Sequence, residues 1–227
     1  MSEFSPLWIS IKTSITATFI VFFVGIVAAW FMARYKGKAR GIIDAIFTLP
    51  MVLPPTVVGF ILLALIGKNF PIGTILNGFG ITLIFTWFAT VIAATVVAFP
   101  LMYKTCVGAF SQIDINVINA ARTLGASEWK IFWKIAVPLA WPGIAAGTVL
   151  AFARALGEFG ATMMIAGSIP GKTETIPIAI YFAVANGETN NAIKWVVLIF
   201  IISLTVMVAA DKWNKNQGFL VSFSREK

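Results

Sequence analysis

Histidine is absent from this 227-residue chain, and cysteine occurs only once, at Cys106. Without histidine the chain lacks the usual zinc ligand and the usual general base, which argues against most kinds of enzyme. A single cysteine excludes a disulfide within the chain, and we interpret Cys106 as a small core or helix-end residue. No cluster of other ligands is visible, so the sequence predicts no catalytic residue, no metal site and no cofactor.

Charge is also scarce. Charged residues make up 11% of the chain and hydrophobic residues 59%, whereas soluble domains carry roughly 25% charged residues. Several apolar stretches reach the roughly 20 residues that a helix needs to cross a bilayer. Because backbone polar groups in lipid must be paired internally, such stretches are helices. The sequence therefore predicts an all-α polytopic membrane protein.

Five membrane spans can be placed along the chain. The N-terminus has no basic segment before its first apolar run, which is too long for a signal peptide, so we interpret that run as a retained span. Residues 49–55, Leu-Pro-Met-Val-Leu-Pro-Pro, predict a break or kink in the second span. Residues 157–191 are interrupted by Gly and Pro and are ambiguous, and residues 67–80 read as a loop. The predicted spans are residues 7–33, 42–66, 81–107, 137–156 and 193–210.

Cations predict the orientation. The net charge is +8, but the cations lie in short clusters between apolar spans, a pattern typical of cytoplasmic loops facing anionic lipid rather than of nucleic-acid binding. Residues 34–40, 104–134 and those after 210 hold twelve of the seventeen cations. Five spans place all three regions in the cytoplasm, with the N-terminus outside and the C-terminus inside. A sixth span within 157–191 is the alternative, but it would put the basic tail outside, so we expect a partly re-entrant external loop there.

The most polar interior segment, about residues 111–135, predicts a helix, a turn and a second helix. Asp114 or Ser111 can cap the first helix, and Gly125 can take the left-handed position that ends it. Ser127 can cap the second helix, with Glu128 in its first turn. Ala120 and Ala121 are expected to leave a shallow face for another protein. Trp129, Phe132 and Trp133 are expected near the membrane surface.

This segment resembles the signature loop of ABC importer permeases: Glu-Ala-Ala, three residues, Gly, nine residues, Ile, one residue, Leu-Pro. Here the spacing from Ala121 through Gly125 to Ile135 matches, while Asn119 replaces Glu and Val137 replaces Leu. The resemblance implies a cytoplasmic coupling helix that sits in a groove of a separate ATPase, with a type I importer-like fold. The residues so implied are Asn119, Ala120, Ala121, Arg122, Gly125, Ala126 and Ser127.

Three further segments narrow the resemblance to the oxyanion branch, which includes molybdate, tungstate and sulfate permeases. They are residues 49–60, residues 151–162 (Ala-Phe-Ala-Arg-Ala-Leu-Gly-Glu-Phe-Gly-Ala-Thr) and residues 169–181, the last similar to molybdate members in particular. The resemblance covers about residues 8–213. It implies a single transmembrane permease domain over residues 1–227 in a bacterial-type cytoplasmic membrane. The implied partners are a second copy of the chain, an ATP-binding subunit dimer and an extracytoplasmic oxyanion-binding protein.

Several residues are candidates for the pore or gate. Arg154 and Glu158 lie four apart on one helix face, and charges at membrane depth usually face a bundle interior or water. Arg154 could offer positive potential to a dianion with Glu158 holding its side chain, or the pair could only fix helix packing. Pro54, Pro55 and Thr56 lie at a break that could form a gate or a packing kink, and Thr162 could add a hydroxyl to the path. In contrast, small residues repeating every four positions, at 143, 147, 151 and 155, favour helix packing.

Other functions are less consistent with the sequence. Residues 166–173 look like a phosphate-binding loop, but Ala166 stands where that motif needs Gly and Pro170 interrupts it, so any ATP must be hydrolysed by a partner. An intramembrane protease or metalloenzyme would need residues that are missing. A passive channel would need no helix for docking an ATPase. Within the importer class, tungstate or sulfate remains the alternative cargo to molybdate.

Overall fold

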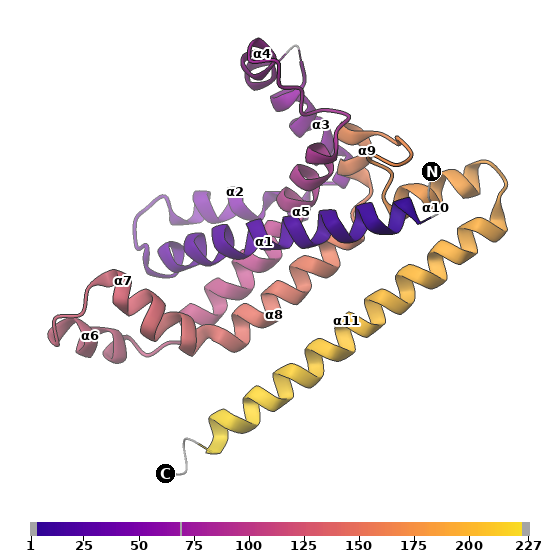
Figure 1. Cartoon of the computed structure of the whole chain (residues 1–227). Helices are drawn as coiled ribbons and strands as arrows, with labels where there is room; N and C mark the ends of the chain where they lie inside the picture. Colours follow the sequence, from indigo (N-terminus) through magenta and orange to yellow (C-terminus); the bar gives the residue numbers. More distant parts are fainter. Residues whose placement is uncertain (1–3, 69, 224–227) are drawn as a thin grey trace.

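The protein is built from helices, as a computed structural model that describes residues 4–68 and 70–223 shows (Figure 1). A long bundle carries two short helices, within residues 55–78, at one end; at the other end residues 112–136 form an elbow between two long helices. The helices are α1 (Ser5–Arg34), α2 (Arg40–Val52), α3 (Pro55–Ile66), α4 (Pro71–Gly78), α5 (Trp87–Ser111), α6 (Ile115–Thr123), α7 (Glu128–Ile131), a π-helical turn (Phe132–Ala136), α8 (Val137–Leu156), α9 (Gly160–Ala166), α10 (Ile176–Ala185) and α11 (Thr189–Phe223).

Four helices in the described chain are long and apolar enough to cross a membrane: Ser5–Arg34, Trp87–Ser111, Glu128–Leu156 and Thr189–Ala210. The pair α2 and α3 passes the same test together but bends by 114°. Counting that pair as one broken span gives the five spans that the sequence predicts. The only other apolar helix of intermediate length, α10, has ten residues, about half of what a crossing needs, so the described residues offer no sixth span.

The proline break in the second span is confirmed. Helix α2 ends at Val52 and α3 begins at Pro55, while Leu53 and Pro54 between them are extended, with ψ of 144° and 138°. Proline disfavours helical geometry in the residue before it and cannot donate a backbone hydrogen bond. Pro100, by contrast, lies within α5 without ending it.

Several predicted boundaries were wrong. Residues 67–80 contain a short helix, α4, instead of a continuous loop. The third span begins at Trp87 and not near residue 81, because residues 81–86 include an extended Thr86 and Phe85 at φ 57°. The last span ends at Ala210 as predicted, and helix α11 itself continues to Phe223. The ambiguous segment 157–191 holds two short helices, of which α9 packs against α3 and α5.

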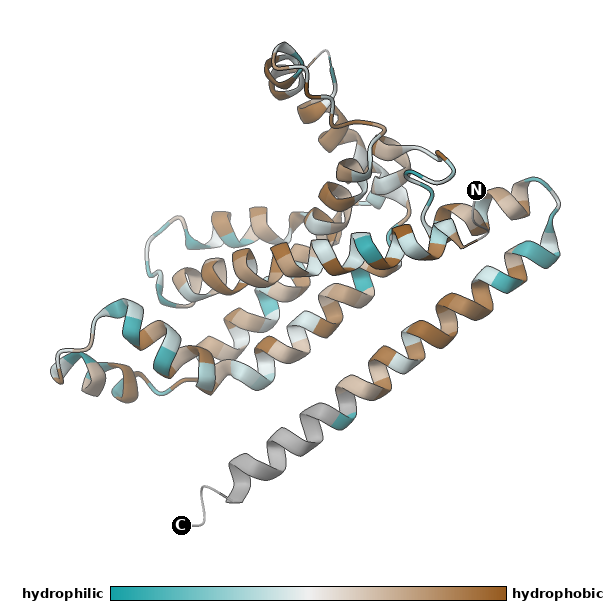
Figure 2. Cartoon of the chain, viewed as in Figure 1, coloured by the Kyte–Doolittle hydropathy of each residue, from teal (hydrophilic) through white to brown (hydrophobic). Residues whose placement is uncertain are grey.

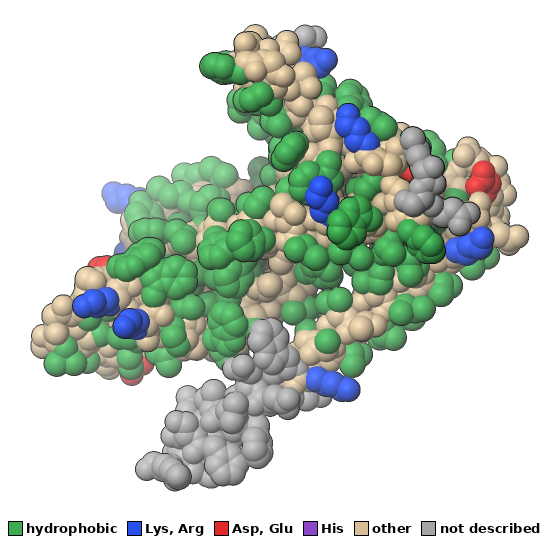
Figure 3. All heavy atoms as spheres, viewed as in Figure 1, with side chains coloured by type: hydrophobic (Ala, Val, Ile, Leu, Met, Phe, Trp, Pro, Cys, Tyr) green, Lys and Arg blue, Asp and Glu red, His purple; other side chains and the backbone are tan. Residues whose placement is uncertain are grey.

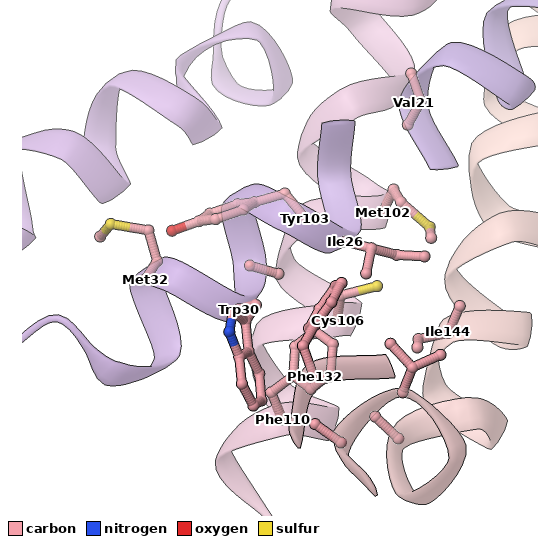
Figure 4. Close-up of a cluster of buried hydrophobic side chains, with 14 of the residues drawn as sticks. Val21, Ile26, Trp30, Met32, Met102, Tyr103, Cys106, Phe110, Phe132 and Ile144 are labelled. Atoms are coloured by element: carbon pink, nitrogen blue, oxygen red, sulfur yellow. The ribbon is translucent and has the colours of Figure 1, made fainter. Parts of the chain in front are cut away.

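The core lies where α1, α5 and α8 run side by side (Figure 1). Figure 4 shows Trp30, Phe110 and Phe132 clustered near the elbow end, with Cys106 beside them. Trp30 lies 5.3 Å from Phe110 and 5.2 Å from Phe132, between ring centroids. Such pairs add about 0.5–1.5 kcal/mol each beyond their burial. Cys106 is fully buried, as expected for a core residue.

Small residues on α8 allow its close packing against α5. A side chain at Gly143 would begin 2.5 Å from Ala109 Cβ, and one at Gly147 would begin 3.1 Å from Met102 Sδ. Ala151 and Ala155 continue the same buried face. The packing interpretation of this repeat is therefore confirmed, within the chain itself.

Other faces remain open and apolar. Helix α2 has no buried residue, and only 6% of the apolar part of α11 is buried. Figure 2 shows that brown, hydrophobic positions dominate the long helices, whereas teal positions concentrate in the elbow and at the α10–α11 turn. In Figure 3 apolar side chains spread over most of the visible bundle. Apolar surface of this extent marks a membrane or protein interaction face.

A close crossing joins α3 to α9, and it yields a prediction. A Cβ at Gly59 would lie 2.7 Å from Met164 Cβ and 2.9 Å from the Ala161 backbone. We expect Gly59→Ala to force the helices apart, at a cost of about 1–3 kcal/mol. The melting temperature of the detergent-solubilised protein should then fall by roughly 2–4 °C per kcal/mol. Gly108→Ala is the matched control, because nothing lies within 4 Å of a Cβ there; equal melting temperatures for the two variants would contradict the packing assignment.

Candidate functional site

The elbow between α5 and α8 is closed by local hydrogen bonds. The Asp114 carboxylate accepts the Asn116 backbone N–H at 2.8 Å, and the Ser127 hydroxyl accepts the Lys130 backbone N–H at 3.4 Å. Gly125 has φ +77°, the left-handed geometry that favours glycine after a helix. The predicted turn residue and second cap are confirmed, and Asp114 rather than Ser111 caps the first helix.

One face of α6 is fixed to the bundle and the other is open. Ile118 and Ala121 are buried in the main core cluster, at 2% and 8% exposure. Ala121 therefore points inward and cannot contribute to the predicted shallow outer face, which Ala120 alone retains. Ala126 packs partly against the same cluster. The signature residues that remain exposed are Asn119, Ala120, Arg122, Gly125 and Ser127.

Charged side chains tie the elbow together. Arg122 Nε lies 2.6 Å from Glu128 Oε1 and its Nη2 lies 3.2 Å from Oε2, a two-pronged pair. Arg122 also donates to Asn119 Oδ1 at 3.2 Å. The hydrogen bond from the Arg122 guanidinium to Glu128 raises the pKa of Arg122. Asn119, which stands where the signature has Glu, therefore has Arg122 as a hydrogen-bond partner within the elbow.

Aromatic residues divide between core and surface. Trp129 is 69% and Trp133 37% exposed, in keeping with a place near the membrane surface. Phe132 is 4% exposed and packs on Trp30, so it belongs to the core of the bundle; its depth relative to the membrane surface stays a prediction. The π-helical turn begins at Phe132 and joins α7 to α8, so residues Glu128–Leu156 form one continuous span. Single π turns inside helices are frequent at functional sites.

Two pore candidates, Arg154 and Glu158, form an ion pair at the far end of α8. Arg154 Nη1 lies 2.7 Å from Glu158 Oε2, an ion pair without hydrogen-bond alignment. The other oxygen of Glu158 accepts the Ala161 backbone N–H at 2.7 Å and so caps α9. The Glu158 side chain is 2% exposed, whereas Arg154 is 31% exposed. Glu158 is a structural anchor, and Arg154 keeps an accessible face.

The proline break lies against this corner. A Cβ on Gly160 would fall 2.8 Å from Pro55 Cβ and 3.4 Å from the Thr56 nitrogen, so the start of α9 contacts the start of α3. Pro54, Pro55 and Thr56 are exposed, and Thr162 is only 1% exposed. The structure thus brings Pro55, Thr56 and Glu158 to one region and leaves Thr162 inside the subunit; the gate and pore roles of all these residues stay predictions.

A second polar cluster was not foreseen from the sequence. Asp44 on α2 accepts hydrogen bonds from the Tyr103 hydroxyl at 2.8 Å and from Lys104 Nζ at 2.6 Å. These bonds attach α2, which has no buried residue of its own, to α5. The sequence does offer one sign of this cluster, because Asp44 is an acidic residue in an otherwise apolar predicted span.

Known proteins resemble this chain over almost its whole length. Residues 22–212 match the family model described as the binding-protein-dependent transport system inner membrane component. The chain belongs to that family. Its members are membrane permease components, which agrees with the all-helical fold and the multi-pass pattern.

Named relatives narrow the comparison within this permease family. The Bacillus subtilis protein YvgM, whose name refers to molybdenum transport, is 46% identical over 90% of both chains. The molybdenum transport system permease protein ModB of Escherichia coli K12 is 40% identical, over 99% of this chain and 96% of its own. A relative from Chlorokybus atmophyticus named for sulfate transport, cysT, is 34% identical over 88% of this chain and 70% of its own.

Solved structures support the fold of this permease. A chain of the inward-facing MetNI methionine ABC transporter has a TM-score of 0.72 at 19% identity, covering 95% of this chain and 99% of that one. A chain of a bacterial ABC transporter that imports alginate has a TM-score of 0.71 at 16% identity, covering 95% and 80%. At such identities the likeness concerns the fold alone.

The left-handed turn of the elbow gives a prediction that does not depend on the cargo. Gly125→Ala should strain the turn by about 1–2 kcal/mol, because a Cβ clashes in left-handed backbone. Gly125→Asn is the matched control, since Asn tolerates this geometry. Hydrogen–deuterium exchange over residues 115–131 should be faster in the Ala variant than in the Asn variant. Equal exchange in both would show that the turn does not hold the elbow.

Proposed function

We propose that this chain is the transmembrane permease subunit of an ATP-driven ABC importer that moves molybdate across the cytoplasmic membrane. The chain acts as one permease domain and hydrolyses no ATP itself; a separate subunit does so. Support for the cargo comes from relatives named for molybdenum transport that align over nearly all of the chain, including the elbow and the Arg154 corner.

The observation that carries the proposal is the elbow. It presents Asn119, Ala120, Gly125 and Ser127 on an exposed surface, while Ile118 and Ala121 anchor it to the bundle core. A small, rigidly capped helix with one open face is suited to insertion into a groove of another protein. A passive channel would have no use for such an element, which favours an importer driven by an ATPase dimer.

The orientation follows from the placement of the cations. The loop after α1 and the elbow lie at the same end of the bundle (Figure 1), and both are rich in Lys and Arg. Cytoplasmic segments of membrane proteins carry an excess of these residues. This charge distribution supports an orientation in which this end faces the cytoplasm, with the N-terminus outside and the C-terminus inside.

A second copy of the chain completes the translocation path. One subunit buries no residue of α2 completely and exposes Pro54 and Pro55 at the broken α2–α3 junction, and it has too few helices to surround an oxyanion. Two facing subunits would cover these surfaces and line a path between them. An extracytoplasmic binding protein delivers the oxyanion to the outer end, and ATPase closure at the elbows rocks the two bundles.

Arg154 is the residue proposed to meet the dianion. Its side chain is partly exposed at the α8–α9 corner, where the start of α9 contacts the exposed start of α3. Glu158 holds the side chain in place through a 2.7 Å ion pair. Because Glu158 also caps α9, the pair has a packing role as well, and the two roles can be separated by experiment.

The decisive test is uptake of labelled molybdate and sulfate by vesicles that contain the reconstituted permease, ATPase and binding protein. ATP-dependent uptake of molybdate in preference to sulfate would support the proposal. Preferential uptake of sulfate would show that sulfate is the cargo, the alternative suggested by the relative named for sulfate transport. Tungstate is tested as a competitor of molybdate uptake. Uptake that runs down the gradient without ATP would favour the passive channel and overturn the proposal.

Replacing Arg154 tests the pore assignment. We expect Arg154→Gln to lower molybdate uptake by about tenfold while the complex still assembles, because the positive potential on the path is lost. Arg154→Lys, which keeps the charge, should retain more uptake than Arg154→Gln. Uptake rates and complex yield are measured together. Unchanged kinetics in the Gln variant would remove the pore role, and loss of assembly would leave only the packing role.

A further inference from the structure

Glu128 lies where three parts of the permease meet. Its two carboxylate oxygens accept hydrogen bonds from the guanidinium of Arg122, near the end of α6, at 2.6 and 3.2 Å. Arg34, the last residue of α1, lies 3.4 Å from Oε2 of the same carboxylate. Glu128 itself begins α7. One carboxylate therefore connects the elbow, the helix that leads into α8, and the inner end of α1.

The connection to α1 crosses an open groove. A cavity of about 330 Å³ lies between α1 and α7, lined by Trp30, Phe31, Arg34, Glu128 and Trp129 among others. The Arg34 guanidinium stacks on the Trp30 ring, 3.0 Å from its centroid, and is 26% exposed. Stacking on an aromatic ring fixes the planar guanidinium, so Arg34 is held ready to bridge the groove to Glu128.

The other end of α1 is attached to the outer part of the subunit. The Ser10 hydroxyl accepts the Ile176 backbone N–H at 2.7 Å in a buried contact, at the start of α10. Thr13 and Thr90 share a 2.9 Å hydrogen bond that ties α1 to α5. Helix α1 runs unbroken from Ser10 to Arg34, a length of about 36 Å at 1.5 Å per residue.

We propose that Glu128 is a positioning residue of the transport cycle, which clamps the coupling elbow to α1 so that α1 carries elbow motion to the outer loop before α10. The proposal rests on the proposed importer function. The continuous helix Glu128–Leu156 provides one mechanical route from the elbow to the Arg154 corner. The Glu128–Arg34 pair adds a second route, through α1 and Ser10, to the region of residues 167–176.

The pairs are solvent-exposed, so their effect should appear in coupling more than in stability. Isolated exposed ion pairs contribute little, whereas two-pronged pairs and networks contribute more. The Glu128 side chain is 59% exposed and Arg122 42% exposed. Removing the charge should loosen the contact of the elbow with α1 without unfolding the capped turn.

The test compares Glu128→Gln with the unaltered permease in vesicles holding the complete complex. Gln keeps the size of the side chain and removes its charge. We expect the complex to assemble and its basal ATP hydrolysis to persist, while molybdate taken up per ATP hydrolysed falls about fivefold. An unchanged ratio would overturn the proposal. Loss of the ATPase from the complex would also overturn it, because Glu128 would then be a docking residue.

The matched control is Glu188→Gln. Glu188 is an exposed carboxylate at the opposite end, bonded to Asn191 at 2.9 Å, and its loss should leave the ratio unchanged. The unaltered complex separates the two proposals: if it takes up no molybdate, the proposed function fails. If it transports normally and Glu128→Gln matches it, only the role of Glu128 fails.

Exchange of charges distinguishes the contact of Glu128 with Arg122 from its contact with Arg34. In the double variant R122E/E128R the elbow pair is restored with reversed charges, but Arg34 then faces an arginine. We expect this variant to keep a low uptake per ATP, and the triple variant R34E/R122E/E128R to recover it. Full recovery in the double variant, or none in the triple variant despite assembly, would show that the contact with α1 does not carry coupling.

Discussion

Backbone hydrogen bonding in hydrocarbon is the constraint on which the rest of this structure depends, since an unpaired polar group there costs several kcal/mol. A long helix satisfies this constraint because its backbone N–H and C=O groups pair with one another inside the helix. The chain departs from regular helix at the α2–α3 junction and at the α8–α9 corner, and these two places support each other. Gly160 lets α9 approach Pro55, Gly59 lets α3 approach Ala161, and Glu158 accepts the Ala161 backbone N–H. Protein therefore covers one side of the irregular backbone at these two places. The other side is free to line the proposed translocation path.

The elbow and the corner are parts of one mechanical element. The span Glu128–Leu156 begins in the elbow and ends two residues after Arg154. Gly143 and Gly147 allow this span to pack closely against α5, and this close packing opposes bending of the span away from the bundle. A displacement applied at the elbow is therefore expected to move the whole bundle as a body. Rocking of such bodies is how alternating access works in many transporters.

Much of this arrangement could be predicted from the sequence, because lipid restricts the choices. The five spans, the break at Pro54, the caps at Asp114 and Ser127, and the turn at Gly125 follow from local rules about hydropathy, proline and glycine. Predictions failed where tertiary contacts decide. Which of Ala120 and Ala121 points outward depends on how α6 is rotated against the core. The packing of Phe132 on Trp30, from a distant helix, has no signal in the sequence either. The contacts of Glu128 with Arg34 and of Asp44 with Lys104 join residues 94 and 60 positions apart, which no local pattern reveals. The Arg154–Glu158 pair was visible from spacing, but its role as a cap for α9 was not.

The central claim is that the elbow faces the cytoplasm and is covered there by the ATPase, and cysteine accessibility tests it most directly. Leu124 lies at the tip of the elbow and is 87% exposed, whereas the single native cysteine, Cys106, is fully buried. With Cys106 replaced by Ala and Leu124 by Cys, a membrane-impermeant maleimide should label inverted vesicles but not right-side-out vesicles. Addition of the ATPase subunit should then protect residue 124 from the reagent. Labelling of right-side-out vesicles, or labelling that the bound ATPase does not reduce, would contradict the account.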